Sequence, residues 1–232
     1  KDGYNSCFIS SKIHRKMTNL TATPAVLVCQ DIAIQRGEFV LCEGVNLTLY
    51  KGEICHIIGE NGTGKTTFLM QLAGLLPIET GEVFYQGEMQ LPVQPLYIAH
   101  QVGIHLQLSV EQNLRFLLAL YGINPSDDEL AIALDWVGLS GYEGVACYQL
   151  SAGQTRRVGL ARLYFYQSGA KLVAQCPFWL LDEPLTALDV AMIAKVEAIV
   201  QDFARQGGTV LMTSHQAVTV ANRLLDLTEF MV

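Results

Sequence analysis

The chain has 232 residues, of which 50% are hydrophobic and 16% charged, and its formal net charge is −7. This composition is typical of a globular protein and excludes a disordered chain. The acidic balance argues against a surface for nucleic acid, so we expect no nucleic-acid partner. The most apolar stretch, residues 170–181, contains Lys171 and Pro177 and is shorter than the ~18 residues that a membrane span requires.

The N-terminal part of the chain combines a polar tail with strand patterns. Residues 1–22 are polar and lack periodicity, so we expect a poorly ordered tail before a domain over residues 23–232. Apolar runs typical of strands occupy residues 26–29, 39–41, 45–49 and 54–58. The last run is rich in β-branched residues, as expected of a strand buried on both faces. Helical spacing follows over residues 65–74, with Leu75 expected on the apolar side.

The rest of the chain alternates between strands and helices. Further strand patterns occupy residues 81–86, 95–100, 178–181 and 209–213. A mainly helical segment, residues 103–168, precedes the third of these strands, and a helix pattern over residues 190–205 precedes the fourth. The alternation predicts an α/β fold with a mainly parallel sheet covered by helices, into which the helical segment is inserted.

Residues 59–66 match the phosphate-loop pattern G-x-x-x-x-G-K-[ST] and lie between a predicted buried strand and a predicted helix. The glycines let the backbone wrap phosphate oxygens, and the helix beginning at Lys65 directs its N-terminal amides at the anion. Lys65 would contact the β- and γ-phosphates, and Thr66 would offer a hydroxyl to Mg²⁺. The predicted nucleotide-binding residues here are Gly59, Glu60, Asn61, Gly62, Thr63, Gly64, Lys65, Thr66 and Thr67. Alone, this loop indicates only a nucleoside triphosphate, since GTPases, kinases, helicases and transporters share it.

Five further motifs accompany the loop in a distinctive order. They are Gln101, residues 150–154 (Leu-Ser-Ala-Gly-Gln), a strand ending in Asp182 and Glu183, residues 186–189 (Thr-Ala-Leu-Asp) and residues 213–215 (Thr-Ser-His). Together they resemble the Q-loop, signature, Walker B strand, D-loop and switch histidine of ABC transporter ATPases. The resemblance covers residues 25–220 and implies an ABC-type P-loop nucleotide-binding domain with an N-terminal antiparallel β part and an inserted helical subdomain.

The resemblance to ABC ATPases implies a role for each polar residue of these motifs. Thr66, Gln101 and Asp182 would hold Mg²⁺, which prefers oxygen ligands. Glu183 would hold or activate the attacking water, and His215 would contact the γ-phosphate. Gln101 would also report the state of the γ-phosphate to the helical segment. The expected catalytic residues are therefore Glu183, His215 and Gln101, and the expected small molecules are ATP and Mg²⁺.

In this family the signature of one subunit closes over ATP held by another, which implies a head-to-tail dimer of two copies with two shared sites. The residues that would contact ATP in this way are Ser151, Ala152, Gly153 and Gln154, and Asp189 would belong to the D-loop. Ala152 replaces a glycine of the family signature, so this position need not adopt a positive φ. Arg36 stands where many relatives carry an aromatic residue that stacks on adenine. Stacking by Arg36, substitution by Phe39, and ordinary packing of both residues are all open.

A closer resemblance connects the chain to the haem-export ATPases of cytochrome c maturation. The residues on which this resemblance rests are 150–158 and 161–163, the His100-Gln101 pair with residues 103–104, and residues 213–216. The resemblance implies integral membrane transporter subunits as partners and a role in handing haem to a periplasmic chaperone. It also implies a peripheral location on the cytoplasmic face of the bacterial inner membrane. The histidines lack the context of a haem site, so we expect no direct haem site on this chain.

The surface for the membrane subunits is expected on the helical segment at residues 103–113. Phe116 and Tyr121 are further candidates for this surface, but packing in the helix core is the favoured assignment for both. Two alternatives remain open, namely the ATPase of another ABC transporter and a soluble ABC ATPase without a transport role. A P-loop kinase or GTPase would not account for residues 150–154. A non-hydrolysing assembly subunit is a further alternative, which substitution of Glu183 distinguishes.

Overall fold

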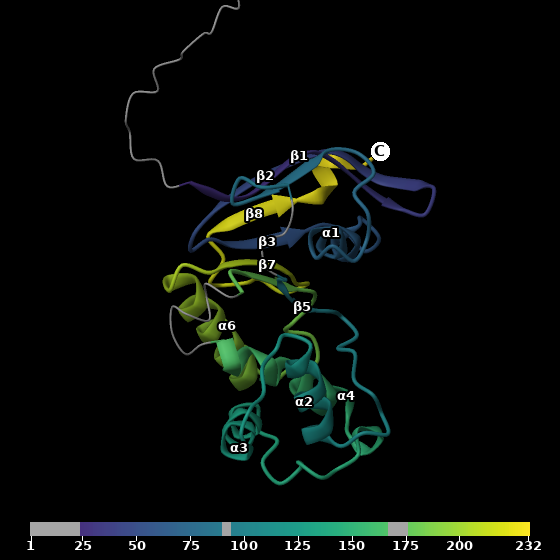
Figure 1. The fold of residues 1–232 in the computed structure, drawn as a ribbon. Coiled ribbons are helices and arrows are strands. Elements are labelled where there is room, and N and C mark those ends of the chain that lie inside the picture. Colours follow the sequence, from purple (N-terminus) through teal and green to yellow (C-terminus); the bar gives the residue numbers. More distant parts are fainter. Residues whose placement is uncertain (1–23, 90–93, 167–175) are drawn as a thin grey trace, which may run out of the picture.

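The computed structural model describes residues 24–89, 94–166 and 176–232, so the tail predicted over residues 1–22 lies outside the described residues. The strands form two sheets, which Figure 1 shows stacked above a group of helices. Within the described ranges, the structure contains no helix with the length and hydrophobicity needed to cross a membrane.

The first sheet is antiparallel, with the strand order β2-β1-β4. Its strands are β1 (Ala25–Arg36), β2 (Phe39–Tyr50) and β4 (Glu82–Tyr85). The antiparallel β part is thus confirmed, but β2 is one long strand where the sequence pattern predicted two short ones. The β1–β2 pair contains register shifts, and Asp31 and Gly44 adopt positive φ values of 51° and 67°. Such irregularities, typical of β-bulges, interrupt the period-2 pattern without ending the strand.

The second sheet is parallel, with the strand order β5-β6-β7-β3-β8. Its strands are β3 (Ile54–Ile58), β5 (Leu96–Ile98), β6 (Phe178–Leu181), β7 (Thr209–Thr213) and β8 (Arg223–Asp226). The predicted α/β class is confirmed, because helices lie between β3 and β5, between β5 and β6, and between β6 and β7 along the chain. β3 is buried along most of its length, as its β-branched composition predicted.

The helices vary in length from one turn to four. They are α1 (Lys65–Leu72), α2 (Val110–Ala119), α3 (Asp127–Trp136), α4 (Ala152–Leu160) and α6 (Val190–Arg205), with short 3₁₀ turns η1 (Cys147–Gln149), η2 (Ala161–Tyr166) and η3 (Leu227–Phe230). Gly74, with φ 71°, follows the end of α1 in the left-handed conformation common after helices. Leu75 lies beyond this turn and is 56% exposed, so the expectation that it shares the apolar side of the helix is wrong.

Two hydrophobic cores lie on opposite faces of the parallel sheet. Along β6, Trp179 and Leu181 face the core that contains the helices, while Phe178 and Leu180 face the core shared with α1 and the antiparallel sheet. This alternation follows from the period of two along a strand. Figure 1 shows β1, β2 and α1 on one side of the sheet and α2, α3, α4 and α6 on the other.

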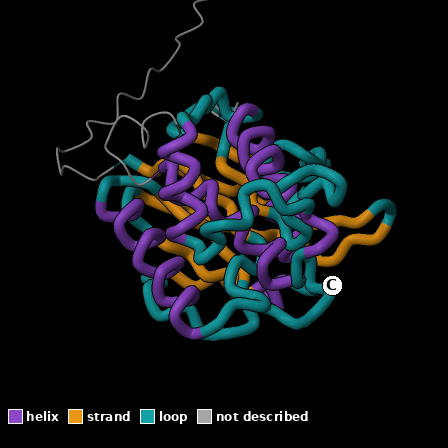
Figure 2. The backbone as a smooth tube through the Cα atoms, turned by 90° about the horizontal axis from the view of Figure 1, so that it is seen from below, coloured by secondary structure: helices purple, strands orange, loops and turns teal. Residues whose placement is uncertain are grey.

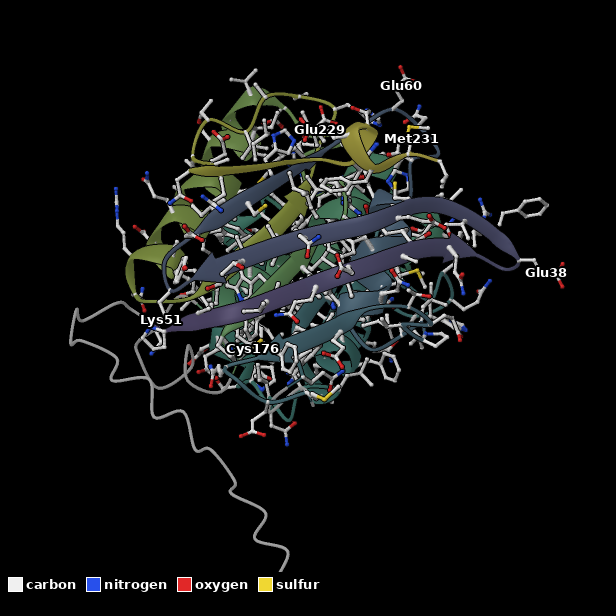
Figure 3. All side chains as sticks on the ribbon, turned by 90° about the horizontal axis from the view of Figure 1, so that it is seen from above. Glu38, Lys51, Glu60, Cys176, Glu229 and Met231 are labelled. Carbon is white, nitrogen blue, oxygen red and sulfur yellow. The ribbon has the colours of Figure 1, made fainter. Side chains whose placement is uncertain are left out.

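The edge of the parallel sheet gathers four loops at one place. The phosphate loop follows β3, His100 follows β5, Asp182 and Glu183 follow β6, and His215 follows β7. Because the carboxyl ends of parallel strands share an edge, residues far apart in the chain meet there. Figure 2 shows the helices covering the sheet from below, with the β1–β2 hairpin extending outward, and Figure 3 places Glu38 at the end of that hairpin.

Candidate functional site

The phosphate loop between β3 and α1 depends on glycine for its backbone conformation. Gly59, Gly62 and Gly64 have φ values of 147°, 91° and 99°, which residues with a side chain rarely adopt. A Cβ atom at Gly64 would lie 2.6 Å from a methyl carbon of Ile34 in β1. Any larger residue at this position would therefore push the loop away from the antiparallel sheet.

Lys65, the first residue of α1, bends back over the loop. Its Nζ donates to the carbonyl oxygens of Gly59 at 2.7 Å and Glu60 at 2.9 Å, and the residue is only 9% exposed. These carbonyls accept hydrogen bonds from two of the three N–H donors of the ammonium group. An anion on the loop would offer charged acceptors instead, and hydrogen bonds between ionised groups are stronger.

Asp182, directly after β6, has both carboxylate oxygens engaged. Oδ2 accepts a hydrogen bond from the hydroxyl of Thr66 at 2.8 Å, and Oδ1 accepts one from the hydroxyl of Thr213 at 2.8 Å. The residue is 1% exposed. The Thr213 hydroxyl in turn accepts from the backbone N–H of Glu183 at 2.8 Å. One side chain of β7 thereby holds both acidic residues at the end of β6.

Glu183 has an unusual backbone and one carboxylate oxygen without a donor. Its φ of 52° lies in the left-handed region, which is costly for a residue with a side chain. Oε2 accepts from the backbone N–H of His215 and from the Thr186 hydroxyl, each at 3.3 Å. Oε1 is buried and 3.6 Å from Nε2 of His215, and it receives no hydrogen bond from any described residue. The lone pairs of this oxygen are therefore not used by hydrogen bonds within the described part of the chain.

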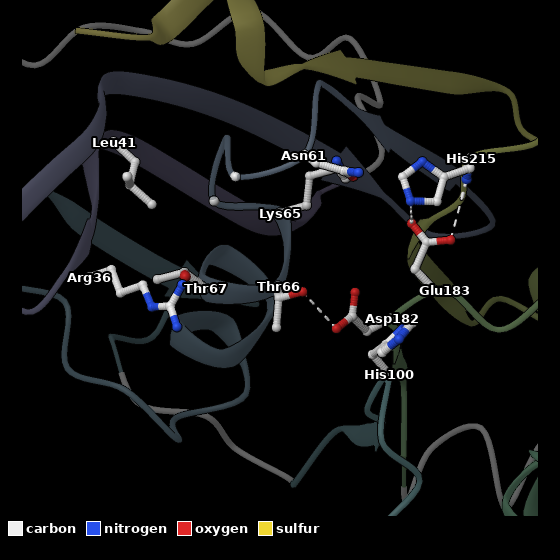
Figure 4. A pocket seen from close by; sticks show the side chains of 12 residues that line it. Arg36, Leu41, Asn61, Lys65, Thr66, Thr67, His100, Asp182, Glu183 and His215 are labelled. Atoms are coloured by element: carbon white, nitrogen blue, oxygen red, sulfur yellow. Dashed lines mark hydrogen bonds and ion pairs between the residues drawn. The ribbon is translucent and has the colours of Figure 1, made fainter. Parts of the chain in front are cut away.

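The loops at the sheet edge enclose a cavity of about 470 Å³. Its lining consists of Arg36, Leu41, Asn61, Gly62, Gly64, Lys65, Thr66, Thr67, His100, Asp182, Glu183 and His215. Figure 4 shows the polar end of the cavity at Glu183 and His215, while Arg36 and Leu41 lie at the opposite end beside Thr67. Most of the residues predicted for nucleotide and catalysis are thus brought together.

Two lining residues were missed by the sequence analysis. Leu41 comes from β2 and reaches the cavity because the β1–β2 pairing places it beside the phosphate loop, near Gly64. His100 occupies the place expected for Gln101. The signal for His100 was its position as the last residue of a predicted strand of the parallel sheet. No sequence signal identified Leu41, because its role depends on the pairing of two strands.

Several predicted residues lie outside this cavity. Gln101 lines two adjoining hollows instead, since the chain turns away from the sheet edge after His100. Phe39 is 77% exposed and does not line the cavity, so its proposed contact with a base is not reproduced. Within the loop, Thr63 is buried and its hydroxyl donates to the carbonyl of Glu60 at 3.0 Å, so it supports the loop from inside.

The predicted signature residues begin α4, away from the cavity of the same chain. The side chain of Ser151 accepts from the backbone N–H of Gln154, and the side chain of Gln154 accepts from the backbone N–H of Ser151, which is a capping box. Ala152 is the first helical residue and therefore needs no positive φ, as expected. A Cβ on Gly153 would lie 2.9 Å from the Ala187 carbonyl, so glycine permits close contact there.

Charged groups behind the site are also held in place. Asp189 caps α6 through the backbone N–H of Met192 and pairs with Arg157 on α4. These contacts lower the pKa of Asp189, the Met192 bond being the largest cause. Burial lowers the pKa of Arg156 to about 10, although the carboxylates of Asp182 and Glu183 oppose that shift. Arg156 consequently keeps its positive charge at neutral pH.

Comparison with protein families and curated proteins gives consistent matches. The profile of a family described as "ABC transporter" matches residues 42–186. A protein named cytochrome c biogenesis ATP-binding export protein CcmA, from Saccharophagus degradans, is 38% identical over 214 residues, covering 87% of this chain and 92% of that protein. The protein of the same name from Vibrio cholerae is 39% identical, covering 85% and 94%.

Solved structures share the fold. An ABC transporter ATP-binding protein from Pyrococcus furiosus superposes with a TM-score of 0.75 at 24% identity, covering 89% of this chain and 99% of that one. A dimeric ATP-binding cassette in a post-hydrolysis state, bound to ADP and Pi, superposes with a TM-score of 0.69 at 23% identity, covering 86% and 93%. At these identities the likeness concerns the fold alone.

Proposed function

The chain belongs to the ABC transporter family of ATP-binding proteins, and we propose that it is the ATP-hydrolysing subunit of a transporter that exports haem, or hands it over, in cytochrome c maturation. Two relatives at 38% and 39% identity are named cytochrome c biogenesis ATP-binding export proteins. The chain spans 92% and 94% of their lengths, so the match extends well beyond the phosphate loop. The arginine-rich signature at residues 150–158 supports the same subfamily.

One observation carries the proposal, which is the convergence of four strand-end loops on a single cavity. Lys65 lies on one side of it, and Asp182, Glu183 and His215 lie on the other. A triphosphate seated on the loop amides would receive the Lys65 ammonium in place of the two carbonyls that now hold it. The base would then extend toward Arg36 and Leu41, which offer a planar cation and an apolar contact.

The donor set at the Thr66–Asp182 pair fits Mg²⁺. A hydroxyl and a carboxylate oxygen lie 2.8 Å apart at the cavity, and hard oxygen donors of this kind suit the ion. Thr66 and Asp182 would hold the ion from the cavity, and Gln101 is proposed as the third protein ligand although it lines the adjoining hollows in this structure. Bound there, the ion would neutralise charge on the β- and γ-phosphate oxygens.

Glu183 and His215 are positioned to act on the attacking water. The free Oε1 of Glu183 accepts a proton from that water as the water oxygen bonds to the γ-phosphorus and the bond to the β-phosphate oxygen breaks. His215, 3.6 Å away, holds the γ-phosphate from the same side. ADP and phosphate are the products, and the transferred proton remains on Glu183 until it returns to solvent.

A second copy of the chain would complete the site. Ser151 and Ala152 are exposed, and neither they nor Gly153 and Gln154 line the cavity of their own chain. In a head-to-tail dimer, the start of α4 from one copy would direct its hydroxyl and amide donors at ATP bound to the other copy. The D-loop residue Asp189, half exposed at the start of α6, would lie in the same interface.

We further propose that the protein acts as a peripheral subunit on the cytoplasmic face of the bacterial inner membrane, bound to integral membrane transporter subunits. The proposed contact surface is residues 103–113, extended by Phe116. That aromatic is 55% exposed, so its assignment to the helix core is wrong, whereas Tyr121 packs against the core as expected. No nucleic-acid partner and no direct haem site are part of this proposal.

Substitution of Glu183 tests the hydrolytic function. We expect Glu183→Gln to lose at least about a hundredfold in ATP turnover, since general-base catalysis contributes about 10²–10⁴. With ATP, the same variant should elute from a sizing column as a dimer, because its ATP is not consumed. Glu38→Gln, at the exposed end of the β1–β2 hairpin, serves as the matched control and should behave as the wild type. Unchanged turnover in Glu183→Gln would refute the assignment.

The transported cargo is tested in cells. Bacteria that lack this chain should lose covalently attached haem in their c-type cytochromes, while b-type cytochromes remain at normal levels. The wild-type gene should restore the c-type cytochromes, and the Glu183→Gln variant should not. Normal c-type cytochromes in the deletion strain would exclude a role in their maturation while leaving the ATPase assignment intact.

A further inference from the structure

Arg156, in the second turn of α4, joins the signature helix to the residues that carry out hydrolysis. It is 6% exposed, and its guanidinium donates four hydrogen bonds, all of them to backbone carbonyl oxygens. Nη1 donates to Ala99 and His100, at 2.8 Å each. Nη2 donates to Asp182 at 2.8 Å and to Glu183. None of these acceptors belongs to α4 itself.

The four carbonyls mark the place where the β5–β6 ladder stops. The paired residues end at Ile98 and Leu181, and the N–H of Asp182 makes one further bond to the carbonyl of Ile98 at 2.8 Å. Among the described residues, no further β5–β6 pair follows that point. Arg156 therefore links the residues after β5 to the residues after β6, beyond the last hydrogen bond between the two strands. Each terminal nitrogen of its planar guanidinium donates to two carbonyls.

The bond to Glu183 also supports a strained backbone. Glu183 holds φ at 52°, a conformation that persists only where its surroundings impose it. Thr213 accepts from the N–H of this residue and Arg156 donates to its carbonyl, so the peptide units on both sides of the Glu183 Cα are held. The direction of the Glu183 carboxylate follows from that backbone.

We propose that Arg156 is a positioning residue for ATP hydrolysis, which clamps the backbone of Glu183 and the turn at His100 to the helix that bears the signature. This inference rests on the proposed function, because it assumes that Glu183 acts on water. A shift of α4 moves both strand ends with it. The contact made by the signature with a second copy is thereby transmitted to the hydrolysing residues of its own chain.

Arg162 provides a matched control for burial and charge. It is 4% exposed, and it donates to the carbonyls of Gly159 at 3.0 Å and Tyr97 at 3.4 Å, but not to the residues after β6. Replacing either arginine by lysine keeps the charge and removes the fork. A general loss of packing would affect both variants, whereas a loss of positioning would affect only Arg156→Lys.

The test measures kcat and KM for ATP with the full chain, together with thermal denaturation and equilibrium binding of a non-hydrolysable ATP analogue. In Arg156→Lys we expect kcat to fall at least about tenfold, since displacing a catalytic group by about 1 Å can cost a hundredfold. KM and analogue affinity should stay within about threefold, because the Lys65 loop is untouched. Arg162→Lys should keep the wild-type kcat.

The outcomes separate this inference from the function on which it rests. Wild-type kcat in Arg156→Lys, an equal fall in Arg162→Lys, or a change confined to KM would each overturn the positioning role. Arg156→Gln provides a second variant at this position. When folded, it should have a lower kcat than Arg156→Lys. A wild-type chain without ATPase activity, or a fully active Glu183→Gln variant, would instead overturn the proposed function.

Discussion

Replacing Thr213 by valine should destabilise the protein more than the loss of one ordinary hydrogen bond. The Thr213 hydroxyl accepts from the N–H of Glu183 and donates to the Asp182 carboxylate, and the residue is fully buried. Valine has nearly the same shape but leaves an N–H group and a charged oxygen without these partners. A buried N–H without a partner costs about 1–3 kcal/mol, and a hydrogen bond to a charged group contributes about 1.5–3 kcal/mol. We therefore expect a loss of about 2.5–6 kcal/mol in the free energy of unfolding.

Thr209, at the start of the same strand, supplies the matched control. It is 1% exposed, and its hydroxyl donates to one neutral carbonyl, that of Tyr50, at 3.1 Å. Thr209→Val should cost about 1 kcal/mol, and Thr213→Ser should cost less than Thr213→Val because the hydroxyl is kept. Urea denaturation, monitored by circular dichroism, gives the free energy of unfolding of all three variants. Equal losses in the free energy of unfolding of Thr209→Val and Thr213→Val would refute the reasoning that the hydrogen bond to the Asp182 carboxylate adds to the stabilisation by Thr213.

Three further predictions follow from the loop and the core. Gly64→Ala should lower the melting temperature more than Gly62→Ala, because both positions have positive φ but only the former has a neighbouring atom within 4 Å of the added Cβ. Lys65→Ala should abolish measurable binding of an ATP analogue in calorimetry, and unchanged affinity would contradict the phosphate-loop assignment. Burial raises the pKa of the Cys29 and Cys55 thiols from 9.0 to about 12. Above pH 9 the unfolded thiols ionise while the folded ones stay protonated, so the free energy of unfolding should fall between pH 9 and 12. Alanine at both positions should reduce the dependence of the free energy of unfolding on pH. An unchanged dependence would argue against burial of the two thiols.

The parts of the site that are contiguous in the chain could be predicted from local sequence patterns. Residues 59–66 form the predicted loop between a buried strand and a helix, since glycine spacing and apolar composition act locally. The placement of Asp182 and Glu183 after a buried strand was equally predictable, because an apolar run ends directly before them. The parallel sheet then follows from the alternation of strands and helices.

Which side chains meet at the site depends on how the elements pack against one another. The pairing of β1 with β2 places Leu41 at the cavity, and the turn after β5 places His100 there while Gln101 lies outside. The four bonds of Arg156 join two strand ends to a helix, and their acceptors are up to 57 positions away in the chain. Such contacts depend on the relative positions of packed elements, and the period of apolar residues along one element carries no information about them.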